Sequence, residues 1–150
     1  MTQVHVIGPG EAFPKWCDRE QLADFLYVNM KPYEDRLEDI GRGIDYAMDS
    51  DRGGWILFAH RAQELQGASV VLKTGMGGYV PENMLLFIGV RPDLRGRGIG
   101  GKLIGEIQKR IDGDLKLHVE HDNPALRLYQ RLGFKNKYLE MRWSPDEVGS

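Results

Sequence analysis

Hydrophobic residues in the first third of the chain follow one strand pattern and two helical patterns. Residues 4–7 form an apolar run of strand length that ends at Gly-Pro-Gly. Asp18-Arg19-Glu20-Gln21 fits a capping box, and the apolar residues that follow have helical spacing: Leu22, Phe25, Leu26 and Met30. A second helix is predicted from near Pro32, with one apolar face made by Tyr33, Leu37, Ile40, Ile44 and Met48.

From residue 55 onward the pattern changes to strands that alternate with helices. Apolar runs predict strands at 55–59, 67–72 and 84–90, the first two forming a hairpin and the third buried on both faces. Helices are predicted from Gly98 and over 124–132, and two further strands at 115–120 and 138–143. Because no repeat or linker interrupts this order, residues 1–150 are expected to form one α/β domain.

Composition narrows the class of protein. The chain has 20 Lys and Arg against 22 Asp and Glu, whereas a dedicated nucleic-acid binder usually carries a basic excess. The single cysteine, Cys17, cannot form an internal disulfide, and the N-terminus lacks the basic start and apolar run of a signal peptide. No apolar stretch approaches the ~20 residues of a membrane helix. We therefore expect a cytoplasmic protein that binds neither nucleic acid nor membrane.

The charge is concentrated in residues 18–51. This segment holds ten acidic and four basic residues, a net charge of −6, although the whole chain carries only −2. One interpretation is that the acids line the solvated faces of two helices; the other is an acidic surface that attracts a cationic partner.

The most informative segment is a glycine-rich loop that follows the apolar run 84–90 and opens a helix. It contains four glycines (Gly96, Gly98, Gly100 and Gly101) and two arginines, Arg95 and Arg97. Glycine lets the backbone approach a ligand closely, and the N–H groups at a helix start form an anion site. Arginine adds forked donors suited to phosphate oxygens. The loop is therefore predicted to bind a phosphate.

The loop alone leaves two kinds of phosphate compound open. Gly96-x-Gly98-x-x-Gly101 formally matches the dinucleotide fingerprint, with Glu120 as a conceivable ribose partner. That fingerprint starts directly after a strand, whereas five residues separate Val90 from Gly96. A dinucleotide-dependent oxidoreductase is therefore the weaker alternative, and the absence of Gly-x-x-x-x-Gly-Lys-Ser/Thr excludes a P-loop.

Two motifs resemble those of the GCN5-related N-acetyltransferase (GNAT) superfamily. Arg95-Gly96-Arg97-Gly98-Ile99-Gly100 resembles its acetyl-CoA pyrophosphate loop, Arg/Gln-x-x-Gly-x-Gly/Ala, and Ile88-Gly89-Val90 resembles the strand before it. Downstream, Asn123, Leu128-Tyr129 and Gly133-Phe134 resemble its second signature, so the resemblance covers residues 84–134. It implies a central mixed, mostly antiparallel sheet with a splayed strand pair, flanked by about four helices.

The second signature departs from the family by one residue. Asn123 lies six positions before Tyr129, whereas the family usually has seven, so Asp122 is the alternative occupant of the Asn position. Asn123 is preferred because its side chain can both donate and accept hydrogen bonds.

The resemblance implies acetyl transfer from acetyl-CoA to a primary amine by direct attack in a ternary complex, with no metal. It assigns cofactor binding to the loop residues Arg95, Gly96, Arg97, Gly98, Ile99, Gly100 and Gly101, to the strand residues Ile88, Gly89 and Val90, and to Asn123 and Tyr129. In this assignment the Val90 N–H polarises the thioester carbonyl. Tyr129 is the candidate acid for the leaving thiolate, with a core aromatic as the alternative interpretation.

The acceptor amine must lose a proton before it attacks, which calls for a base. His118 stands where family members acting on protein N-termini have a Glu, and its ordinary pKa suits a base at neutral pH. Glu120, two residues on and thus on the same face of the predicted strand, is its rival. Glu82 and His60 are weaker candidates, and an ordered water chain is an alternative to any single base.

The acidic segment predicts a cationic acceptor, either a small molecule or a peptide or protein. The alternative from another class is a non-catalytic acetyl-CoA-binding or regulatory module on the same fold. The apolar segment 138–143 is β-prone enough to pair two copies through an edge strand, which leaves a homodimer open.

Overall fold

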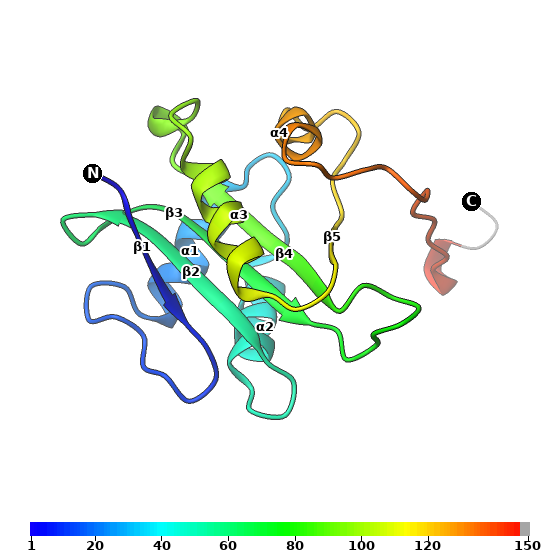
Figure 1. The fold of residues 1–150 in the computed structure, drawn as a ribbon, viewed down its shortest axis with the longest axis horizontal. Helices are drawn as coiled ribbons and strands as arrows, with labels where there is room; N and C mark the ends of the chain where they lie inside the picture. Colours follow the sequence, from blue (N-terminus) through cyan, green and yellow to red (C-terminus); the bar gives the residue numbers. More distant parts are fainter. Residues whose placement is uncertain (148–150) are drawn as a thin grey trace. The chain divides into compact units, whose positions relative to one another are not determined.

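The computed structural model describes residues 1–147, in two compact units. The first unit, Met1–Leu117, holds a five-stranded sheet and the helices α1, α2 and α3 (Figure 1). The second unit begins at His118; up to residue 147 it holds the helix α4 and one short 3-10 helix, Pro145–Glu147. None of the helices within residues 1–147 has the length and apolar composition needed to cross a membrane.

The sheet is mixed and mostly antiparallel, as the GNAT resemblance implies. Its order is β1-β2-β3-β4-β5, in which every neighbouring pair is antiparallel except the parallel pair β4 and β5. The strands span Gln3–Ile7, Gly54–Arg61, Glu64–Lys73, Asn83–Val90 and Leu115–Leu117, in chain order.

β4 and β5 separate halfway along β4. Val70 pairs with Phe87 but Val71 pairs with Leu85, so Leu86 is an extra residue that forms a bulge. The last pair between β4 and β5 is Leu85 with Leu117, directly before this bulge. Because a bulge bends its strand and increases the twist, β4 diverges from β5 there and continues to Val90 paired with β3 alone. This is the splayed strand pair. The prediction of a strand through Glu120 is wrong, because β5 loses its partner after Leu117.

Helices cover both faces of the sheet (Figure 1). α1, Arg19–Asn29, and α2, Leu37–Met48, pack on one face, and α3, Ile99–Arg110, packs on the other. The capping box is confirmed, since the Gln21 N–H donates to Asp18 Oδ1 and the Asp18 N–H donates to Gln21 Oε1, both at 2.8 Å. α2 begins at Leu37 and not near Pro32, because the chain first makes a turn in which the Tyr33 N–H donates to the Met30 carbonyl at 2.8 Å.

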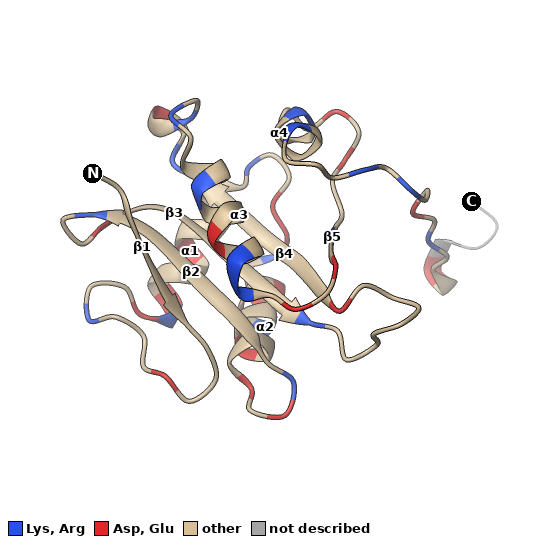
Figure 2. Cartoon of the chain, in the orientation of Figure 1, with Lys and Arg blue, Asp and Glu red and all other residues tan. Residues whose placement is uncertain are grey.

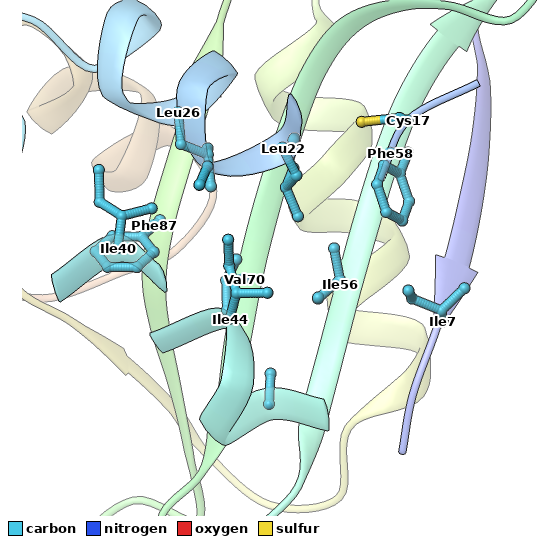
Figure 3. Close-up of a cluster of buried hydrophobic side chains, with 13 residues drawn as sticks. Ile7, Cys17, Leu22, Leu26, Ile40, Ile44, Ile56, Phe58, Val70 and Phe87 are labelled. Atoms are coloured by element: carbon cyan, nitrogen blue, oxygen red, sulfur yellow. The ribbon is translucent and has the colours of Figure 1, made fainter. Parts of the chain in front are cut away.

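The main core lies between the sheet and the two N-terminal helices. Leu22 and Leu26 of α1 and Ile40 and Ile44 of α2 are fully buried, and Figure 3 shows them around the sheet residues Ile56, Phe58, Val70 and Phe87. On the opposite face α3 buries Ile99, Leu103, Ile104 and Ile107. Gly67 of β3 permits this approach, because a Cβ there would lie 3.1 Å from Ile99 Cγ2.

In the second unit α4, Ala125–Arg131, forms within its predicted range, but the predicted strand at 138–143 is wrong. The large apolar side chains of that segment are 75% to 87% exposed: Tyr138, Leu139, Met141 and Trp143. A strand needs a partner for its backbone N–H and C=O groups, and the described residues of this unit contain no other strand. The strand edge that left a homodimer open is therefore not formed.

Candidate active site

The glycine-rich loop forms an anion-binding helix start. Gly96 and Gly98 have φ values of 80° and 84°, in the left-handed region that favours glycine, and Gly98 is the N-cap of α3. The first helical bond joins the Lys102 N–H to the Gly98 carbonyl at 2.9 Å. The N–H groups of Ile99, Gly100 and Gly101 consequently lack partners within the helix and, with the positive end of its dipole, suit an anion. An added Cβ at Gly96, Gly98 or Gly101 would meet no atom within 4 Å, so the loop surface is open.

The unpaired edge of β4 lies next to this loop in sequence and presents backbone donors. The Arg91 N–H donates to the Gln66 carbonyl at 2.9 Å, toward β3. Because backbone groups alternate in direction along a strand, the N–H and C=O groups of Val90 and Ile88 face the other side, from which β5 has diverged. The predicted oxyanion donor, the Val90 N–H, therefore belongs to an open strand edge.

The two arginines of the loop have different surroundings. Arg95 Nη2 donates to the Asn29 carbonyl at 2.9 Å, and Arg95 Nε donates to the Val90 carbonyl at 3.3 Å. Both arginines are exposed, and Arg97 has no ion pair within residues 1–147. Figure 2 shows basic residues on the loop before α3 and on α3 itself. Arg97 is therefore the arginine of the loop that remains available to a phosphate.

The remaining candidate residues belong to the second unit. Tyr129 of α4 is 6% exposed, and its ring centroid lies 5.8 Å from that of Phe134. Asn123 Oδ1 accepts the Ala125 N–H at 2.9 Å, which caps α4 and leaves the amide NH₂ as the group to donate to a ligand. His118 and Glu120 are exposed and lie outside β5, so the strand spacing that related them does not apply.

Burial raises the pKa of Tyr129 to about 12. The phenol is consequently protonated at any physiological pH and can donate a hydrogen bond. Tyr129 therefore keeps its proton until a leaving thiolate forms beside it, which the predicted acid role requires.

The two weaker base candidates have partners or surroundings that reduce their basicity. Glu82 Oε1 accepts the Asp114 N–H at 2.9 Å, and this and other backbone hydrogen bonds hold the pKa of Glu82 below its ordinary value. The ring centroid of His60 lies 4.6 Å from that of Trp16, and its Nδ1 is buried without a hydrogen-bond partner among residues 1–147. Burial, with the nearby His5, lowers the pKa of His60. Glu82 thus closes a turn, and His60 packs in an aromatic cluster.

A hollow of about 410 Å³ lies on the α2 side of the sheet, beside the bulge in β4. It is lined by Asp35, Asp39, Arg42, Gly43, Tyr46, Arg52, Leu72, Leu86 and Phe87. Sequence reasoning missed its apolar wall, although Gly43 was a signal. A Cβ on Gly43 would lie 2.6 Å from Leu86 Cδ2 and 2.7 Å from Phe87 Cε2, so this helical glycine marks a close approach of α2 to β4.

The fold and the loop define a class of α/β protein: a splayed parallel strand pair in a mostly antiparallel sheet, with an anion-binding helix start after the inner strand. Residues 52–136 match the family model described as the Acetyltransferase (GNAT) domain. This is more than half of the chain. The protein therefore belongs to the GNAT acetyltransferase family.

Solved structures of GNAT enzymes share the fold over nearly the whole chain. The aminoglycoside N-acetyltransferase AAC(6')-Iy in complex with CoA aligns with a TM-score of 0.68 at 14% identity, over 96% of this chain and 95% of that chain. Ribosomal-protein-alanine N-acetyltransferase from Brucella melitensis biovar Abortus 2308 aligns with a TM-score of 0.67 at 15% identity, over 96% of this chain and 99% of that chain. A GNAT family acetyltransferase from Elizabethkingia anophelis with acetyl-CoA bound aligns with a TM-score of 0.64 at 19% identity, over 99% of this chain and 86% of that chain. At these identities the likeness shows the fold.

Proposed function

We propose that this GNAT protein is an acetyl-CoA-dependent N-acetyltransferase that acetylates a primary amine by direct attack in a ternary complex. The observation that carries the proposal is the pairing of two backbone features. The open helix start at Gly98 suits a pyrophosphate, and the strand just before it presents the N–H groups of Ile88 and Val90 and the carbonyl of Ile88 on the edge that β5 has left. The Val90 carbonyl accepts from Arg95 Nε. An extended pantetheine arm needs such an edge, as an added strand does.

The cofactor would be held mainly by backbone groups. The N–H groups of the Gly96–Gly101 loop would bind the pyrophosphate, and the exposed Arg97 would add positive charge. Ile88 and Val90 would bind the pantetheine amides, and the Asn123 NH₂ would add a donor from the second unit.

In the transfer step the amine nitrogen attacks the thioester carbonyl carbon, the C–N bond forms and the C–S bond breaks. The Val90 N–H would stabilise the oxyanion, and Tyr129 would donate a hydrogen bond to the leaving thiolate. The proton of the acceptor ammonium passes to a base, for which His118 and Glu120 remain the candidates, or to water. The products are the amide, CoA and a proton.

The acceptor would enter the hollow beside the bulge. Asp35 and Asp39 give it an acidic side that attracts an ammonium group, while Leu86 and Phe87 give it an apolar wall. Several acids of residues 18–51 that do not line the hollow form ion pairs with the bases of the same segment, such as Asp45 with Arg19 and Glu38 with Arg36. Asp39 also lies 3.8 Å from Arg42, which lines the same hollow. Arg42 and Arg52 of the same lining balance the charge of the two aspartates, so we infer that Asp35 and Asp39 bind the ammonium group directly, from either a small molecule or an exposed end or side chain of a peptide.

A thermal-shift measurement tests the cofactor. Acetyl-CoA and CoA at 100 times their Kd should each stabilise the protein by about 2.7 kcal/mol. NADH should not, and Gly98→Glu should abolish the effect by placing a carboxylate at the anion site. Stabilisation by NADH alone, or no response to either CoA species, would show that the loop serves another ligand.

Release of free CoA from acetyl-CoA, followed with a thiol reagent, tests transfer over a panel of amines. Burial raises the pKa of Cys17 to about 11, so this cysteine should not react and obscure the signal. Changing Asp35 and Asp39 together to Asn should raise KM for cationic amines about tenfold, with KM for acetyl-CoA unchanged. Glu38→Gln is the matched control, because Glu38 pairs with Arg36 and does not line the hollow. Cofactor binding without turnover on any amine would favour a non-catalytic module.

A further inference from the structure

The end of α1 is capped from a distant part of the chain. The last carbonyls of a helix lack partners within the helix and carry its negative dipole end, which favours a cation. The last turn of α1 contains no basic residue. The carbonyl of Asn29, the last residue of α1, instead accepts a hydrogen bond from Arg95 Nη2 at 2.9 Å, from a residue 66 positions away. Arg95 thus supplies the cation that α1 lacks.

The same guanidinium also holds the end of β4. Arg95 Nε donates to the Val90 carbonyl at 3.3 Å, on the strand edge that β5 has left. The Arg95 N–H donates to the Pro92 carbonyl at 3.4 Å, which closes the short turn after β4. One rigid fork therefore ties the end of α1, the end of β4 and the start of the glycine-rich loop together.

Direct packing brings α1 and β4 close enough for this bridge. Gly89 is buried, and a Cβ there would lie 3.4 Å from Met30 Cγ, 3.5 Å from Leu26 Cδ2 and 3.6 Å from the Asn29 carbonyl carbon. The chain that leaves α1 at this point continues through residues 30–36 to α2 and supplies Asp35 to the hollow.

We propose that Arg95 is a positioning residue that couples the cofactor loop to the wall of the acceptor hollow, and that its side chain is not a ligand of the cofactor phosphates. This inference rests on the proposed acetyltransferase function for its kinetic consequences. Arg97, two residues on, is exposed like Arg95 and has no ion pair within residues 1–147, and it is the phosphate ligand of the pair. The guanidinium of Arg95 points instead to two backbone carbonyls, and its removal would loosen the turn that follows α1.

Acetyl-CoA binding at low and high salt separates the two arginines. Arg97→Met should raise the Kd for acetyl-CoA about tenfold and make it less dependent on salt, because a charge contact with phosphate is lost. Arg95→Met should keep the Kd within about threefold of the wild-type value, with the salt dependence unchanged. In turnover, Arg95→Met should lower kcat and raise KM for the amine, so that kcat/KM for the amine falls about tenfold. Arg95→Lys should have the same low kcat/KM, because one ammonium group cannot reproduce the two hydrogen bonds of the guanidinium.

Amide hydrogen exchange gives a readout that requires no turnover. Exchange at residues 30–36 should be faster in Arg95→Met than in the wild type and in Arg97→Met. An Arg95→Met variant with a raised Kd, a weaker salt dependence and unchanged exchange would overturn the proposal and make Arg95 a phosphate ligand. If the wild-type protein did not bind acetyl-CoA at all, the proposed function would fail, while the exchange data would still decide whether Arg95 holds the turn.

Discussion

Two stretches of the chain, β4 and residues 138–143, were both predicted as strands but have different structures. β4 and residues 138–143 are both rich in large apolar and aromatic residues. β4 pairs with β3 along its length and with β5 over its first three residues, and its Leu85 is 3% exposed. Residues 138–143 form no strand, and Leu139 is 85% exposed. The difference teaches that an apolar, β-prone pattern becomes a strand only where a neighbouring backbone satisfies its N–H and C=O groups.

A matched pair of truncations gives the largest expected contrast between these stretches. Leu85→Ala removes a buried side chain between Val71 and Leu117 and should lower the free energy of unfolding by about 2–5 kcal/mol. Leu139→Ala removes the same atoms from an exposed position and should change it by less than about 0.5 kcal/mol. Urea denaturation of both variants measures the two values. A loss above about 1 kcal/mol in Leu139→Ala would show that this segment is covered in solution and does not differ from β4 in burial.

At the start of α3, which follows β4, a second pair of variants separates the effect of backbone conformation from that of packing. Gly98→Ala and Gly101→Ala each add one methyl group where no atom lies within 4 Å. Gly98 has a φ of 84°, so alanine there should cost about 1–2 kcal/mol. Gly101 lies inside α3, where alanine should stabilise the unliganded protein by about 0.5–1 kcal/mol. If urea denaturation gave the same change in the free energy of unfolding for both variants, the left-handed conformation would not be the reason for a glycine at position 98.

Element type and order were predictable from local pattern. The capping box at Asp18 and the apolar runs of β1 to β4 are signals read from a few neighbouring residues, and the structure confirms these elements with changes at their ends. The glycine-rich loop was equally predictable, because Gly96 and Gly98 adopt a conformation that other residues avoid.

Features set by distant parts of the chain were not predictable. The bulge at Leu86 arises from the register between β3 and β4, and it decides where β5 ends. The partners of Arg95 lie at Asn29 and Val90, so its sequence position beside Arg97 gave no sign of a different role. The start of α2 at Leu37 follows from a turn at Met30–Tyr33 that helical spacing does not register.

The histidines of the first unit, Met1–Leu117, and of the second unit differ in their surroundings, and this difference should have the smallest effect on stability. His60, near the end of β2, packs against Trp16, whereas His118 and His121 of the second unit are exposed. Burial, with the neighbouring His5, lowers the pKa of His60 below its ordinary value of 6.5. The unfolded chain therefore takes up a proton at His60 before the folded chain does, so the stability linked to this residue is present above pH 6.5 and is lost as the pH falls.

Melting temperatures between about pH 7.5 and about pH 5.5 test this sign. The wild-type melting temperature should fall over this range, and the fall should be smaller in His60→Gln, in which the titrating group is absent. His121→Gln, the control from the second unit, should follow the wild-type curve. The pKa values of Asp45 and Glu82 are lowered from 3.8 and 4.5, so their contributions are lost only at lower pH and do not affect this window. A curve for His60→Gln parallel to that of the wild type would show that the acid sensitivity of the sheet unit comes from other groups.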